Sequence, residues 1–178
     1  MIAVERKTSE TDIRVEIAIG EGRAQVQTGV QFLDHMLTAL ARYSGLDLTI
    51  TAKGDLRHHL IEDVGLTLGE AVRRVLPATC ARYGERTVPM DEALVQAVLD
   101  AGGRPFYQGP IPSSLYDHFM RSFCDAAKVT LHLRVLRGAD RHHIVEAAFK
   151  ALGFALRQAL VDTGAVFSTK GAVALESR

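Results

Sequence analysis

The chain has 178 residues, of which 47% are hydrophobic and 24% charged, which favours one globular domain or two small halves that share a core. Its formal net charge is zero, which gives no electrostatic basis for binding nucleic acid or an acidic membrane, so neither is expected as a partner. No apolar run approaches the roughly 20 residues that span a bilayer, and the N-terminus is charged too early for a secretory signal, so a cytoplasmic location is expected.

The first half of the chain is expected to alternate between strands and helices. Ile13, Val15, Ile17 and Ile19 alternate with mainly polar residues, which is typical of a half-buried strand. After a glycine turn, residues 24–30 can return as the hairpin partner of that strand. The elements predicted here are a strand at 12–19, its partner at 24–30, a helix at 33–43, a strand at 46–51, a helix from 58 to Pro77, and a connector at 78–89.

The second half repeats this order, which predicts a duplicated fold. The elements predicted in it are a strand at 93–99, a turn at 102–105, a helix at 113–126, a strand at 129–135 and a helix from 142 to about 161. Each half therefore reads as roughly ββαβα, with a sheet and helices on one face. Two such halves, 1–86 and 87–178, related by a pseudo-twofold axis, predict a single α+β domain similar to domain 2 of ribosomal protein S5.

Histidines and carboxylates mark the repeat most clearly. Each half carries an H-H-x-x-E sequence at the start of a helix and one earlier histidine that follows an aspartate, and the spacing agrees to within one residue. A single histidine pair at a helix start is more often a solvated or capping feature, whereas duplication of the whole pattern favours metal ligation. The eight residues are His35, His58, His59 and Glu62 in the first half, and His118, His142, His143 and Glu146 in the second.

The helical geometry of these residues predicts two metal ions. His58 and Glu62 are one turn apart and share a helix face, whereas His59 is rotated by about 100° from His58, so adjacent histidines cannot easily grip one ion together. If each helix gives one histidine to each metal ion, the six histidines and two glutamates supply about four protein ligands per ion. Each ion then keeps coordination positions open for a substrate. Imidazole with carboxylate suits manganese, iron, zinc or nickel. Divergent histidines also suit a site shared between subunits, so an oligomer with interface sites is expected.

Basic residues outside the histidine pattern suggest an anion site. Arginine offers a fork for phosphate oxygens and lysine a point charge, although each taken singly is more often a surface charge. Lys150 lies one helical turn beyond Glu146 on the same face, and residues 167–171 form a polar, glycine-ended loop that could close over a ligand. The candidate anion-binding residues are Arg82, Arg104, Lys150, Ser168 and Lys170. His132 lies on a predicted strand outside the pattern and is expected to have another role.

Several long motifs resemble one known family. The motifs, in chain order, are FLDHML, HHLIEDVGLTLGEA, GGRPF, DHFMRSF, HHIVEAAFKALGFALRQA and STKG. Together they resemble imidazoleglycerol-phosphate dehydratase of L-histidine biosynthesis. The resemblance implies a duplicated α+β fold, a homo-oligomer of 24 subunits, and active sites at subunit interfaces with two Mn²⁺ ions each. The implied reaction removes water from D-erythro-imidazole-glycerol phosphate to give imidazole-acetol phosphate.

Residue by residue, the resemblance implies roles for the candidates already named. The six histidines of the repeat, with Glu62 and Glu146, match the family's metal ligands, and the five anion-binding candidates match its phosphate-binding positions. Glu10 matches an acidic residue placed at the substrate. The residues then expected to take part directly in the reaction are Glu10, His35, His59 and Glu146.

The chemistry of the substrate agrees with such a site. The proton on the carbon next to the imidazole ring is not acidic unless the ring takes up the resulting charge, and two metal ions on the ring nitrogens would allow this. Phosphate-binding residues would fix the distance between tail and ring. Either Glu10 or a metal-bound water could transfer protons.

The chain departs from the family at three places. Residues 54–57 lack the acidic stretch that usually precedes the first histidine pair, and residues 106–114 are shorter than the usual loop. Ala39 and Tyr43 stand where the family commonly has glutamine and histidine. Two rival functions remain from the residues alone: a di-metal phosphatase or other hydrolase, and a non-catalytic shell in which metal ions only join subunits.

Overall fold

The computed structural model describes residues 1–168, and all structural statements concern that part of the chain. The first half contains four strands and two helices, and the second half repeats the same order. The first-half elements are β1 (Ile2–Lys7), β2 (Thr11–Ile19), β3 (Ala24–Gln27), α1 (Gln31–Ser44), β4 (Leu46–Gly54) and α2 (Arg57–Val75). The second-half elements are β5 (Tyr83–Met90), β6 (Ala93–Asp100), β7 (Phe106–Gln108), α3 (Ser114–Ala127), β8 (Thr130–Arg137) and α4 (Arg141–Ala159).

The two halves have the same sheet topology, which confirms the predicted duplication. The first sheet has the order β1-β2-β4-β3 and the second the order β5-β6-β8-β7. In each sheet the first two pairs of neighbouring strands in this order are antiparallel, and the last pair is parallel. The alternating burial of β2, from Thr11 to Ala18, places Ile13, Val15 and Ile17 in the core, as the apolar pattern predicted.

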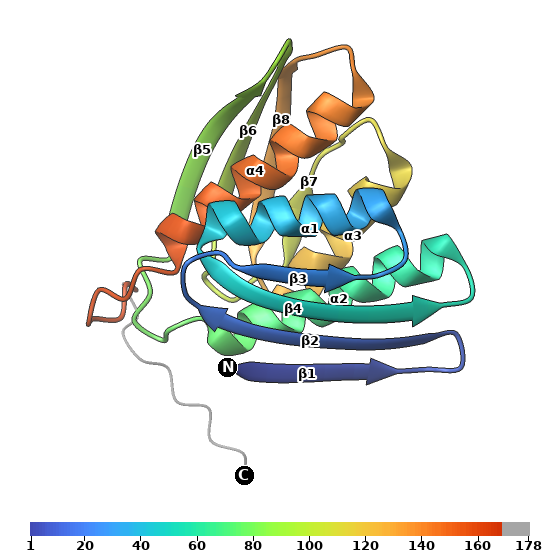
Figure 1. The fold of residues 1–178 in the computed structure, drawn as a ribbon. Coiled ribbons are helices and arrows are strands. Elements are labelled where there is room, and N and C mark those ends of the chain that lie inside the picture. The colour runs from blue at the N-terminus through green and yellow to red at the C-terminus, as the bar shows by residue number, and fades with distance from the viewer. Residues whose placement is uncertain (169–178) are drawn as a thin grey trace.

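The four helices fill the space between the two sheets (Figure 1). Helices α1 and α2 pack on the first sheet, α3 and α4 on the second, and contacts between the halves join α1 to α4 and α2 to α3. Glycine permits one of these approaches, because a Cβ on Gly69 of α2 would lie 2.4 Å from the carbonyl oxygen of Phe123 on α3. All four helices begin on the same side of the molecule, at the right in Figure 1.

Two details of the predicted fold were wrong. Residues 24–30 do not form a hairpin with the preceding strand, because β3 pairs in parallel with β4 and α1 makes the crossover between them. Residues 78–89 are not simply a connector, because Tyr83–Met90 form β5 and pair along their whole length with β6. The expected division between residues 86 and 87 therefore falls inside β5. The edge strands β1 and β7 had not been predicted.

No helix within residues 1–168 is long and apolar enough to cross a membrane.

Candidate metal centre

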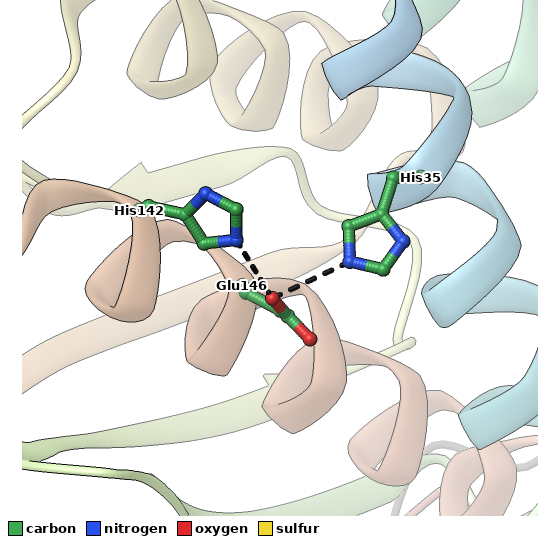
Figure 2. Close-up of side chains that lie close together, drawn as sticks. All are labelled: His35, His142 and Glu146. Atoms are coloured by element: carbon green, nitrogen blue, oxygen red, sulfur yellow. Dashed lines mark hydrogen bonds and ion pairs between the residues drawn. The ribbon is translucent and has the colours of Figure 1, made fainter.

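One imidazole–carboxylate group, here called the first cluster, consists of His35, His142 and Glu146 (Figure 2). His35 lies on α1, whereas His142 and Glu146 are one turn apart at the start of α4. The Glu146 Oε2 lies 3.4 Å from the His35 Nε2 and 3.1 Å from the His142 Nε2. Asp140 caps α4 by accepting hydrogen bonds from the His142 and His143 backbone N–H groups, which fixes the start of this helix.

A second cluster consists of His58, Glu62 and His118. His58 and Glu62 lie one turn apart on α2, and His118 comes from α3. The Glu62 Oε2 lies 3.4 Å from the His58 Nε2, and the Glu62 Oε1 lies 3.5 Å from the His118 Nε2. In each cluster the candidate ligand atoms lie within 4.8 Å of one another, so each could hold a metal ion.

The two clusters are built by exchange between the halves. Each takes a histidine and a glutamate from one H-H-x-x-E helix, and its other histidine from the shorter helix of the opposite half. Neither half holds a complete cluster by itself. His132, on β8, has no place in either cluster and lies with its ring centroid 5.5 Å from that of Phe106.

The second histidine of each pair points away from the cluster on its own helix. The His59 Nδ1 lies 2.9 Å from Asp55 Oδ1 and 3.6 Å from Glu10 Oε2. The His143 Nδ1 lies 2.7 Å from Glu92 Oε2. The hydrogen bond to Asp55 raises the pKa of His59, and the one to Glu92 raises the pKa of His143.

Asp55 and Glu92 were not named as site residues by the sequence reasoning. Glu92 lies in the turn between β5 and β6, and Glu10 lies in the corresponding turn between β1 and β2. The repeat could have revealed this match, because both hairpin turns bring a carboxylate to the second histidine of a pair. Hydrogen bonds from the backbone N–H of Asp140, which has the larger effect, and from the His143 ring lower the pKa of Glu92 to about 2. This carboxylate is therefore ionised.

A buried network supports the turn that carries Glu10. The Thr11 hydroxyl donates to Asp63 on α2, and Asp63 also lies 2.9 Å from the Arg6 Nε. The Thr8 hydroxyl accepts from the backbone N–H groups of Glu10 and Thr11. Glu10 is therefore held by a turn tied to the helix that carries His58, His59 and Glu62.

Lys150 lies directly against the first cluster. Its Nζ is 2.8 Å from the Glu146 Oε1, and both side chains are largely buried. Burial tends to raise the pKa of Glu146, whereas Lys150 and, to a smaller extent, His35 lower it. The resulting pKa of Glu146 lies below the ordinary value. The ammonium predicted to bind phosphate thus faces a carboxylate of the metal centre.

The other candidate phosphate-binding residues lie elsewhere. Arg82 and Ser168 line one cavity of about 340 Å³, together with Gly102 and Gly103. The Arg82 guanidinium lies against Asp100, with Nε 2.7 Å from Oδ1 and Nη2 3.0 Å from Oδ2, and lowers the pKa of that carboxyl. Arg104 directly follows Gly102 and Gly103 in the sequence, and its backbone carbonyl oxygen accepts a hydrogen bond from the Thr130 hydroxyl. Lys170 lies outside the described residues.

This cavity is far from the first cluster of the same chain. The Arg82 backbone N–H donates to the carbonyl oxygen of Ala159, the last residue of α4, whereas Glu146 lies near the beginning of that helix. At a rise of about 1.5 Å per residue, the two positions are separated by about 20 Å. One chain therefore does not place Arg82 beside its own first cluster.

Comparison with known proteins gives the family. The family model for imidazoleglycerol-phosphate dehydratase matches residues 28–156. The imidazoleglycerol-phosphate dehydratase of Salinispora tropica is 49% identical, with 94% of this chain and 96% of that protein aligned. The chain belongs to the imidazoleglycerol-phosphate dehydratase family. It is accordingly an enzyme of the hydro-lyase class.

Solved structures of the imidazoleglycerol-phosphate dehydratase family share the whole fold. The Pyrococcus furiosus enzyme has a TM-score of 0.87 at 44% identity, covering 95% of this chain and 99% of that chain. The Staphylococcus aureus enzyme has a TM-score of 0.79 at 32% identity, covering 92% and 100%. Of the two positions expected to depart from the usual family sequence, Ala39 is buried, and Tyr43 packs edge-on against Phe154, with 4.9 Å between the ring centroids.

Proposed function

We propose that this chain dehydrates D-erythro-imidazole-glycerol phosphate to imidazole-acetol phosphate in L-histidine biosynthesis, with two Mn²⁺ ions in each active site. The observation that carries the proposal is the pair of clusters, each with two imidazoles and one carboxylate. Such mixed nitrogen and oxygen donors fit Mn²⁺, and three ligands per ion leave coordination positions for further groups. The residues present therefore fit the metal that the family resemblance implies.

The second histidines support completion of each cluster by a neighbouring subunit. His59 and His143 have Nδ1 within hydrogen-bonding distance of a carboxylate, the arrangement that commonly fixes an imidazole to coordinate metal through Nε2. Since both rings point away from the clusters of their own helices, we assign them as ligands to the metal ions of adjacent chains. All six histidines and both glutamates of the repeat would then hold metal.

The position of the phosphate-binding candidates supports the same arrangement. Arg82 lies about 20 Å along α4 from Glu146, too far for one small substrate to touch both in a single chain. We propose that Arg82, Arg104, Ser168 and Lys170 bind the phosphate of a substrate whose ring lies at the clusters of another subunit. The active enzyme is then a homo-oligomer, for which the family resemblance suggests 24 subunits in the cytoplasm.

Once bound, the metal ions would coordinate the ring nitrogens and stabilise negative charge on the ring. The protein side chains would orient the substrate, because a phosphate held at one end and a ring held at the other fix the carbon between them. Glu10 lies beside His59 on a supported turn and is about half exposed, so it could reach a substrate. We assign its carboxylate to accept the proton from the middle carbon of the side chain, after the hydroxyl group on the carbon next to the ring departs as water. The same carboxylate then returns the proton to the carbon next to the ring as the enol becomes the ketone.

An assay with imidazole-glycerol phosphate and Mn²⁺ separates this proposal from its rivals. The dehydratase produces imidazole-acetol phosphate without releasing inorganic phosphate. A di-metal hydrolase releases phosphate and forms no keto product, and a metal-built shell does neither but changes its assembly when the metal is removed. Either of these two outcomes contradicts the proposal.

A further inference from the structure

The two clusters differ in charge although their ligands are the same. In the first cluster, the Glu146 Oε1 lies 2.8 Å from the Lys150 Nζ, which leaves Oε2 to face the two histidines. The residue one turn beyond Glu62 in the second cluster is Leu66. Within residues 1–168, the groups at ion-pair distance from Glu62 are the rings of His58 and His118. With neutral imidazoles, the first cluster and its lysine have no net charge, whereas the second cluster carries one negative charge.

The environment of Lys150 holds the ammonium in place. Its side chain is only 16% exposed, and Nζ also lies 3.4 Å from the Met90 sulfur and 5.6 Å from the centroid of the Tyr43 ring. The thioether and the ring face stabilise a cation but carry no formal charge that could replace Glu146 as its partner. The Lys150 ammonium therefore stays beside the first cluster.

The carboxylates also differ in the oxygens that they can offer. Both oxygens of Glu62 face a histidine, at 3.4 and 3.5 Å, and the side chain is 33% exposed. Glu146 is only 7% exposed and shares one oxygen with Lys150. A divalent cation in the first cluster meets a neutralised carboxylate and a nearby positive charge, so its binding is weaker.

We propose that the first cluster binds Mn²⁺ at least about tenfold more weakly than the second, and that Lys150 sets this difference. The inference rests on the proposed function, since it takes the clusters to be metal sites. It adds an order of filling: the second cluster fills first, and the first cluster is the one that empties when free metal falls. Repetition of the ligands has therefore not produced two equal sites.

The test measures manganese bound to the full-length assembled protein at graded free Mn²⁺, set by a competing chelator, with elemental analysis of bound metal. The wild type should lose metal in two steps, separated by about tenfold or more in free Mn²⁺. The His35→Ala variant should lack the weak step, and the His118→Ala variant should lack the tight one. A single step, or a tight step that depends on His35, overturns the proposal.

Two charge variants test the role of Lys150. Lys150→Met should move the weak step toward the tight one by about tenfold. Leu66→Lys, which places an ammonium one turn beyond Glu62 on a half-buried position, should weaken the tight step by a similar factor and does not depend on the folding of the first variant. If neither variant moves its step, the inference fails while the metal sites stand. If the wild type binds manganese at neither cluster, the proposed function fails as well.

Discussion

Mixed assemblies of two inactive variants should recover activity if the active site is shared between chains. The variant His35→Ala lacks a ligand of the first cluster but keeps His59 and His143 for its neighbours. The variants His59→Ala and His143→Ala keep intact first clusters but lack one donated ligand each. In a random mixture of His35→Ala with the variant whose histidine completes the first cluster, half of the first clusters and half of the donors are intact, so about a quarter of wild-type activity should return.

The assay coexpresses two differently tagged variants, isolates mixed assemblies and measures dehydration of imidazole-glycerol phosphate. At least one pairing, of His35→Ala with His59→Ala or with His143→Ala, should recover activity, because the first cluster and the histidine that completes it come from different chains. Coexpression of His35→Ala with Glu146→Gln is the matched control, because both residues belong to one cluster within one chain and no mixture rebuilds it. If both pairings stay as inactive as this control, the assignment of the outward histidines is wrong.

Three further predictions concern ligands, pH and packing. Glu146→Gln should lower bound manganese and activity together, whereas unchanged metal content by elemental analysis would argue against its ligand role. Asp55→Asn removes the main cause of the raised pKa of His59. A raised pKa stabilises the fold fully at pH values below the pKa of the unfolded state, and this stabilisation is lost as the pH rises through the higher pKa of the folded state. The variant should therefore be destabilised more near pH 5.5 than near pH 8.5 in metal-free thermal unfolding. Gly69→Ala should cost about 2–4 kcal/mol in urea unfolding, because its Cβ would lie 2.4 Å from the carbonyl oxygen of Phe123, and a wild-type midpoint would refute that packing argument.

The duplication could be predicted because it is written in local patterns. Alternating apolar residues from Ile13 to Ile19 and the helical spacing of Ile61, Leu68, Val72 and Val75 each predict burial of one face. The structure buries all of them except Ile19, which is exposed, and Val75, which is half-buried. The repeated H-H-x-x-E sequence also fixed the first turn of α2 and of α4, since a histidine and a glutamate one turn apart must share a helix face.

Strand partners could not be predicted in the same way. β3 has only four residues, and nothing in their alternation distinguishes a hairpin with β2 from a parallel pair with β4. The choice depends on α1, which must lie on the inner face of the sheet and therefore carries the chain across before β4 begins. β5 was missed because Gly84 and Pro89 lie within it, and both residue types are unfavourable in central strands. Among the described residues, β5 is an edge strand that pairs with β6 alone.

The partnership of ligands depends on how the two halves pack, which no local pattern records. Because α1 packs against α4 and α2 against α3, His35 meets Glu146, and His118 meets Glu62. A single half would have a histidine and a glutamate on one helix, which is too few ligands for a firm metal site. Packing between the halves supplies the third ligand, whereas the second histidines contact carboxylates of their own half, Asp55 for His59 and Glu92 for His143. If neighbouring chains supply further ligands to each other in the same way, metal binding and subunit assembly depend on each other.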